Sequence, residues 1–320
     1  MFIKKERQSE MVASFFIKIF GFLIFFIYLC KKLINIMSKR IIVEGEPKEV
    51  TGIRNKILKE FKDLQFIEDG HKYYLNGQQL PSVSEVTHKF CQYPFDSEER
   101  AAAYAEKHGE TAQYWLDQWK FKNLKATTTG TLVHAYGESL GWLRARHPEF
   151  ITEENKCKYI KEKNWLIPTR PKEEAVLKFW DETFSNENTY FVLAETKVYT
   201  GKNKKLTNLK QDYAGTFDLL WYYRNPTDDS KSGLIILDYK TNGSLTNDFN
   251  RGANRYFAEP FGDLYDEALS SYKLQLSAYQ LPLEDIGLKV IGRRIIWLKD
   301  DGNYELIPID DYTERLRKTL

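Results

Sequence analysis

The chain has 320 residues, of which 42% are hydrophobic, so it is long enough for one large domain or two small ones with a substantial core. Its formal net charge is only +2. Residues 1–37 hold six Lys/Arg against two Glu, or +4, which leaves 2 − 4 = −2 for the rest. A near-neutral body excludes nucleic-acid binding through overall charge, so any such binding needs a local cluster of cations.

The three cysteines, Cys30, Cys91 and Cys157, lie far apart and show no paired spacing. This use of cysteine favours neither a disulfide framework nor a zinc site, and it fits a reducing, cytoplasmic setting. The chain also has no Gly-x4-Gly-Lys-Ser/Thr loop, so no nucleotide cofactor is expected.

The N-terminal segment has three interpretations. Residues 11–30 carry one charge, Lys18, and are long enough to cross a bilayer, but lysines on both sides leave the orientation unspecified. No small-residue cleavage site follows. Phe, Ile and Lys make up 19 of the first 37 residues, as expected when an AT-rich upstream region is translated. We favour a true start at Met37 over a membrane anchor or a buried helix, and expect no membrane partner.

A hairpin is predicted first, over residues 68–83, with its tight turn at Asn76-Gly77. Ser82 then stands where it can cap a helix. Helical periodicity follows in four segments: residues 98–122, 131–146, 171–184 and 272–283. The residues Thr127-Thr128-Thr129-Gly130 are expected to separate the first two helices.

Five strands are predicted from alternating or continuous apolar runs: residues 190–200, 213–223, 233–241, 289–298 and 304–309. The rings of Tyr114, Trp115 and Trp119 fall on neighbouring positions at helical spacing, and are expected to form core; a platform on which bases stack is the alternative. Residues 150–170 have the character of an insertion. Strands mixed with helices predict an α/β fold, in which helices flank a central mixed sheet and a helical elaboration precedes it.

The most informative group of polar side chains lies at the end of the third predicted strand, residues 233–241. Asp238-Tyr239-Lys240 follows the apolar run Leu234–Leu237. Because side chains alternate along a strand, Asp238 and Lys240 project from the same face, about 7 Å apart. The carboxylate can hold a divalent cation, and the ammonium can neutralise charge on a phosphate. Asp218 likewise ends an apolar strand, where a lone carboxylate would be costly.

Four further segments accompany this pair in order: Gly130–His134, Glu195, Gly215–Asp218 and Gln275–Tyr279. The ordered set resembles the RecB-type branch of the PD-(D/E)XK nuclease superfamily, including phage exonucleases and the mitochondrial genome-maintenance exonuclease. The match covers roughly residues 71–300. It implies a restriction-endonuclease-like core at about 130–300 within a single nuclease domain, 38–320.

The resemblance implies hydrolysis that depends on one or two Mg²⁺ or Mn²⁺ ions. The implied metal ligands are Asp218, Asp238, the carbonyl of Tyr239, His134 and Glu195. Lys240 would orient the attacking water or neutralise the transition state. The residues expected to contact nucleic acid are Gln275, Tyr279, Thr241, Lys204 and Lys205. For the last two, in a basic turn, simple solvation is the alternative.

The implied activity is that of a deoxyribonuclease, an exonuclease acting on single-stranded DNA ends, working beside a separate helicase or recombination protein. Two alternatives are a structure-selective endonuclease of the same fold and a non-catalytic nucleic-acid-binding module. The four-cysteine iron–sulfur cluster of some relatives cannot form from three cysteines. The implied location is the cytoplasm of a bacterial or phage-infected cell, with membrane anchoring only if residues 1–37 are real.

Overall fold

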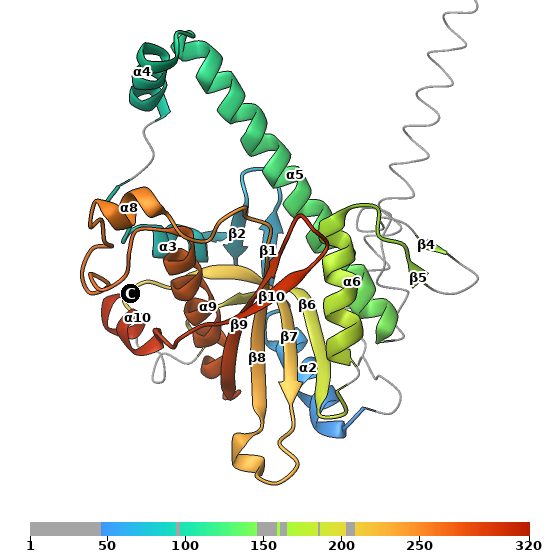
Figure 1. Cartoon of the computed structure of the whole chain (residues 1–320). Helices are drawn as coiled ribbons and strands as arrows, with labels where there is room; N and C mark the ends of the chain where they lie inside the picture. The colour runs from blue at the N-terminus through green and yellow to red at the C-terminus, as the bar shows by residue number, and fades with distance from the viewer. Residues whose placement is uncertain (1–45, 94–96, 146–158, 161–164, 185, 203–208) are drawn as a thin grey trace, which may run out of the picture. The chain divides into compact units, whose positions relative to one another are not determined.

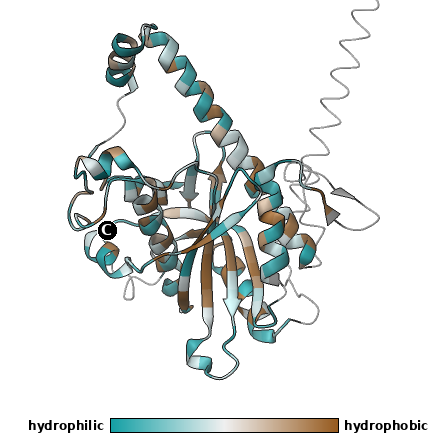
Figure 2. Ribbon diagram, in the orientation of Figure 1, coloured by the Kyte–Doolittle hydropathy of each residue, from teal (hydrophilic) through white to brown (hydrophobic). Residues whose placement is uncertain are grey.

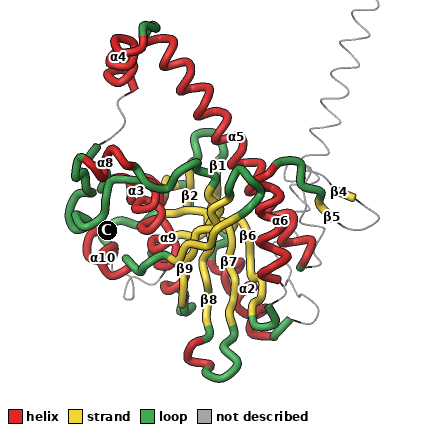
Figure 3. Tube along the Cα trace, in the orientation of Figure 1, coloured by secondary structure: helices red, strands yellow, loops and turns green. Residues whose placement is uncertain are grey.

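The computed structural model describes residues 46–93, 97–145, 159–160, 165–184, 186–202 and 209–320. Its main sheet has five strands in the order β10-β9-β8-β7-β6 (Figures 1 and 3). The strands are Thr189–Tyr199 (β6), Ala214–Tyr223 (β7), Gly233–Lys240 (β8), Val290–Leu298 (β9) and Tyr304–Pro308 (β10). Among these five described strands, β8 and β9 pair in parallel and the other neighbours are antiparallel. The predicted α/β class with a mixed sheet is confirmed, and each strand boundary lies within about one residue of its prediction.

Helices cover both faces of this sheet. The hydroxyl of Tyr239 accepts a hydrogen bond from Trp180 on α6 (Pro171–Phe184), whereas Lys240 lies over the ring of Tyr272 on α9 (Ala268–Asp285). Successive strand residues point to opposite faces, so α6 and α9 lie on opposite sides of β8. Figure 2 shows hydrophobic residues along the strands between them. The core therefore consists of the sheet and the inner faces of these helices.

The long helical region differs from its prediction. Helix α4 (Ser97–His108) ends at Gly109, whose φ is 76°, and α5 (Ala112–Arg144) then runs unbroken through Thr127–Gly130. The expected interruption at these threonines is wrong. The hydroxyls of Thr127 and Thr129 donate to the carbonyls of Asn123 and Lys125, four residues earlier, at 3.1 and 2.8 Å. Bonded in this way, the threonine side chains are satisfied within the helix.

The expectation that Tyr114, Trp115 and Trp119 lie in the core is also wrong. Tyr114 is 43% exposed, and both tryptophans are only partly buried. Trp115 and Trp119 instead pack edge-on against Tyr104 of α4, with ring centroids 5.2 and 5.6 Å apart. The rings join α4 to α5 and leave part of their surface in solvent.

The N-terminal hairpin is confirmed and gains a strand. The strands β1 (Leu64–Ile67), β2 (Lys72–Leu75) and β3 (Gln78–Leu80) form a separate antiparallel sheet. Ser82 caps α3 (Val83–His88) in a capping box with Glu85. Four further helices were not predicted: α2 (Lys48–Glu60), α8 (Asp248–Gly252), α10 (Thr313–Thr319) and a 3-10 turn at Asp229–Lys231.

Two parts of the chain lie largely or wholly outside the described residues. Within the predicted insertion the described residues are 159–160 and 165–170, which include the short strands β4 (Tyr159–Ile160) and β5 (Trp165–Leu166). The N-terminal segment, residues 1–37, lies wholly outside, so its three interpretations stay open. Among the described helices, none combines the length and the apolar character that a membrane crossing requires.

Candidate active site

Asp218 and Asp238 lie side by side on β7 and β8, although Asp218 lies in the interior of β7 and not at its end as predicted. The β7–β8 ladder ends at the pair Leu219 and Leu237, so one step further along the antiparallel register places Asp218 opposite Asp238. Residues directly opposite have Cβ atoms about 4.5–5.5 Å apart. In addition, the backbone N–H of Tyr239 donates to Oδ2 of Asp218 at 2.7 Å. Two carboxylates distant in sequence thus meet at one point of the sheet.

Glu195 extends this pair into a row across three strands. On β6 the pairs Ala194–Leu219 and Thr196–Phe217 flank it, which places Glu195 opposite Asp218. Its φ is 44°, in the left-handed region that a non-glycine residue adopts at a cost of about 1–3 kcal/mol. Such strain inside a strand persists only where the surroundings enforce it, and it is a feature of functional sites.

His134 reaches this row from α5. Its Nδ1 lies 3.2 Å from Oε1 of Glu195 and 3.5 Å from Oδ1 of Asp218. Among the described residues, these three form a group whose ligand atoms all lie within 4.8 Å of one another. Asp238 is not part of that group, and its carboxylate is paired with Lys240. One ring nitrogen and two carboxylates therefore converge on a space that a cation could share.

The electrostatics of the group favour the binding of positive charge. Burial alone would lower the pKa of His134, but the carboxylates of Asp218, Glu195 and Asp238 outweigh it and raise this pKa to about 9. Burial, and then the neighbouring Asp238, raises the pKa of Asp218 well above its usual range. Without a cation, this cluster therefore holds protons that a divalent ion would displace.

Lys240 and Asp238 form an ion pair, which confirms that both project from one face of β8. The ammonium also lies 4.3 Å from the ring centroid of Tyr272. Burial opposes the charge of Lys240, yet Asp238 and Asp218 raise its pKa above the ordinary value. A general base would need the opposite shift, so Lys240 is suited to donate to and stabilise an anion.

The predicted pair on α9 is in contact. Nε2 of Gln275 donates to the hydroxyl of Tyr279 at 3.1 Å. Tyr279 is buried, and burial followed by the charge of Asp238 raises its pKa. Sequence reasoning missed Tyr272, which lies over Lys240 and donates to Asn242 at 2.8 Å. Its position three and seven residues before the predicted pair places it on the same helix face and could have identified it.

Two further residues that the sequence did not single out contact Tyr239, Trp180 from α6 and Gly137 from α5, and so hold both helices against the sheet. The indole N–H of Trp180 donates to the hydroxyl of Tyr239 at 2.9 Å. A Cβ at Gly137 would lie 2.8 Å from the Tyr239 ring, so only glycine allows α5 this close. Gly137 follows His134 by three residues, one helical turn. The close approach therefore sets how far His134 reaches over the carboxylates.

The remaining predicted nucleic-acid contacts are less informative. Thr241 directly follows β8, and its carbonyl accepts a hydrogen bond from Lys172 at 2.7 Å. Lys204 and Lys205 lie outside the described residues.

Compared with models of known families and with curated proteins, the chain matches none.

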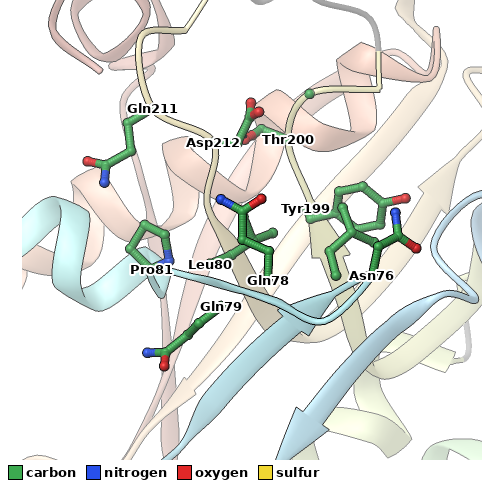
Figure 4. Close-up of a pocket in the computed structure, with 11 residues that line it drawn as sticks. Asn76, Gln78, Gln79, Leu80, Pro81, Tyr199, Thr200, Gln211 and Asp212 are labelled. Carbon is green, nitrogen blue, oxygen red and sulfur yellow. The ribbon is translucent and has the colours of Figure 1, made fainter.

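A cavity of about 400 Å³ lies away from these residues, between the β2–β3 hairpin and the end of β6 (Figure 4). Its polar lining consists mainly of amides, and its carboxylate is that of Asp212, near the hydroxyl of Thr200. Among the described residues that line it there is no Lys or Arg. Its chemistry therefore differs from that of the acidic row and its lysine.

Proposed function

We propose that this protein is a metal-dependent nuclease that hydrolyses phosphodiester bonds of DNA, acting as an exonuclease on single-stranded ends. The observation that supports it best is the convergence of His134, Glu195 and Asp218 beside the Asp238–Lys240 pair. Hydrolysis of a phosphodiester requires stabilisation of negative charge, and this arrangement offers anionic ligands and a cation at one place.

A hard divalent ion fits the residues present. Glu195 and Asp218 offer oxygen ligands, and His134 adds a nitrogen ligand, which Mn²⁺ accepts more readily than Mg²⁺ does. When bound, such an ion supplies charge stabilisation at the phosphate and lowers the pKa of a water molecule. Asp238, adjacent to Asp218, and the carbonyl of Tyr239 are the remaining candidate ligands.

Lys240 has a separate part in this proposal. Asp238 and the ring of Tyr272 fix its ammonium beside the carboxylate row, so the side chain needs little ordering before it meets a phosphate. There it donates hydrogen bonds to a non-bridging oxygen and stabilises the charge that develops in the transition state. The loss of one such donor lowers kcat by about 10²- to 10³-fold in well-studied sites.

The order of elements also supports the PD-(D/E)XK type of core. The helix with His134 precedes β6, β7 and β8, which carry Glu195, Asp218 and Asp238 in turn. The helix α9, with Gln275 and Tyr279, then connects β8 to its parallel neighbour β9. This is the order of the motifs in the resemblance.

The test is cleavage of end-labelled single- and double-stranded DNA with Mg²⁺, with Mn²⁺ and with chelator. We expect metal-dependent release of nucleotides from single-stranded ends, and its loss in Glu195→Gln and Asp218→Asn. Glu187→Gln, an exposed acid just before β6, is the matched control and should cleave normally. Cleavage of circular single strands would indicate an endonuclease. Retardation of DNA without cleavage under every condition would contradict the proposal and favour the binding module.

A further inference from the structure

A second cavity lies where α4 packs against the exposed half of α5. Its volume is about 460 Å³, within the range of about 300–1,000 Å³ typical of small-ligand sites. The residues that line it are Arg100, Tyr104, Trp119, Lys122, Asn123 and Ala126. They come from both helices and include no member of the candidate active site.

The lining chemistry suits a nucleotide. Both charged groups, Arg100 and Lys122, are cations, and Asn123 adds an amide. Tyr104 and Trp119 supply two rings whose centroids lie 5.6 Å apart at an interplanar angle of 82°. Cations bind phosphate and rings stack on bases, the combination that single-strand-binding sites use. Because the body of the protein is near neutral, such a local pair of cations is what nucleic-acid binding requires.

The position of Tyr104 is fixed by its neighbours. His108 stacks on it at 5.0 Å and 30°, and Trp115 packs edge-on at 5.2 Å. Tyr104 is nonetheless 45% exposed. A ring that is held in place but exposed loses little conformational entropy when a base stacks on it.

The cavity and the candidate active site share one face of α5. Ala126 and Gly130 follow Trp119 by seven and eleven residues, which return to nearly the same side of a helix. His134 comes fifteen residues after Trp119, about 22 Å along the axis and about 60° around it. Gly130 lies towards the site, since a Cβ there would approach the hydroxyl of Thr241 to 3.9 Å. A strand along this face could occupy both places at once.

We infer that the α4–α5 cavity is a binding site for one nucleotide of a single strand, remote from the bond that is cut. The choice of ligand rests on the proposed function together with the two cations and two rings. Longer strands would reach both the cavity and the active site, whereas a dinucleotide at the active site would not reach the cavity. The cavity would thereby favour long single strands as substrates.

The test is binding of fluorescent oligothymidylate to the full-length protein, with chelator present so that nothing is cleaved. Trp119→Ala should weaken binding of a long strand roughly 5- to 150-fold. Phe121→Ala is the matched control, because Phe121 lies two residues further on the same helix, is 67% exposed and does not line the cavity. Its affinity should equal that of the wild type.

A second pair of variants tests the cations without risk to folding. Lys122→Ala should reduce the slope of log affinity against log salt by about 0.7, whereas Lys120→Ala, which is exposed and outside the cavity, should leave it unchanged. Wild-type affinity in both Trp119→Ala and Lys122→Ala would overturn the inference. So would an oligomer of the wild-type protein that Trp119→Ala dissociates, because the cavity would then be a protein interface.

The outcomes also separate this inference from the proposed function. Strand binding that depends on Trp119, in a protein that cleaves no DNA, would remove the nuclease and retain the cavity as a binding site. Metal-dependent cleavage in which Trp119→Ala processes long strands and dinucleotides as the wild type does would retain the nuclease and remove the cavity.

Discussion

The two halves of α5 share a helical backbone but differ in the burial of their side chains. The buried residues of the helix all lie between Val133 and Leu143, where it packs on α6 and β6. The half from Ala112 to Thr131 carries rings and leucines too, yet Phe121 is 67% and Leu124 63% exposed. Apolar residues at helical spacing therefore indicate a helix, but only the packing partner decides which of them form core.

The two halves of α5 also differ in where they lie relative to the candidate active site. The buried half brings His134 to the carboxylates and is held there by the contact of Gly137 with Tyr239. The exposed half presents rings and cations that the core does not need. A single helix thus joins the candidate active site to a surface that could hold the rest of a strand.

The largest effect on stability is expected from a pair of leucines. Leu140 is fully buried, so Leu140→Ala should lower the free energy of unfolding by about 2–5 kcal/mol. Leu124→Ala, the same change on the exposed half, should alter it by less than about 0.5 kcal/mol. Urea denaturation measures both. Equal losses of unfolding free energy would show that the exposed half is packed as tightly as the buried half, and would contradict the difference in burial.

A pair of glycines should give the next largest difference. Gly137→Ala places a Cβ 2.8 Å from the Tyr239 ring and should cost about 1–3 kcal/mol through overpacking. Gly130→Ala meets its first neighbour at 3.9 Å, and should be neutral or stabilising by up to about 1 kcal/mol because alanine favours helix. Thermal unfolding of the two variants measures both changes in stability. A stable Gly137→Ala protein would mean that α5 does not depend on this close approach.

The stability of the protein should depend on pH through the protonation of His134. Its pKa rises from 6.5 to about 9 on folding, so its contribution is fully present below pH 6.5 and is lost as the pH rises to about 9. Because the side chain is 30% exposed, we expect a loss of only about 1–2 kcal/mol. Denaturation in chelator across this range measures it. His134→Asn should lack this slope, and an unchanged slope would assign it to other groups.

The smallest effect is expected at the start of α5. Thr111 accepts a hydrogen bond from the backbone of Tyr114 at 3.1 Å, so Thr111→Ala removes a cap worth about 1 kcal/mol. On the exposed half this loss should appear as faster amide exchange near residues 112–116, with an unchanged global unfolding midpoint. A drop in the global midpoint would show that this half unfolds together with the core.

The sequence predicted the main sheet well, and it predicted α4 and the exposed half of α5 poorly. Both outcomes have physical reasons. Apolar or alternating runs bounded by polar turns predicted β6 to β10 to within about a residue. The signal is clearest for the central strands β7 and β8, which must be apolar because helices cover both faces of the sheet. The break at Thr127 was wrong because threonine can satisfy its hydroxyl inside a helix. The rings of Tyr114, Trp115 and Trp119 were wrongly predicted to lie in the core, because helical periodicity does not show whether another element packs on that face.

The candidate site shows the same division. The Asp238–Lys240 contact followed from the alternation of side chains along a strand, a local rule. The left-handed backbone at Glu195 and the fit of Gly137 to Tyr239 arise from tertiary contacts between distant segments. No local pattern could have predicted them, and they determine the distances within the site.

The most direct test of the proposed metal site is anomalous diffraction from crystals of the wild-type protein soaked in Mn²⁺. The account predicts a manganese peak in contact with Nδ1 of His134 and the carboxylates of Glu195 and Asp218. Fully soaked crystals in which that space holds no peak, or in which manganese binds only elsewhere, would contradict it.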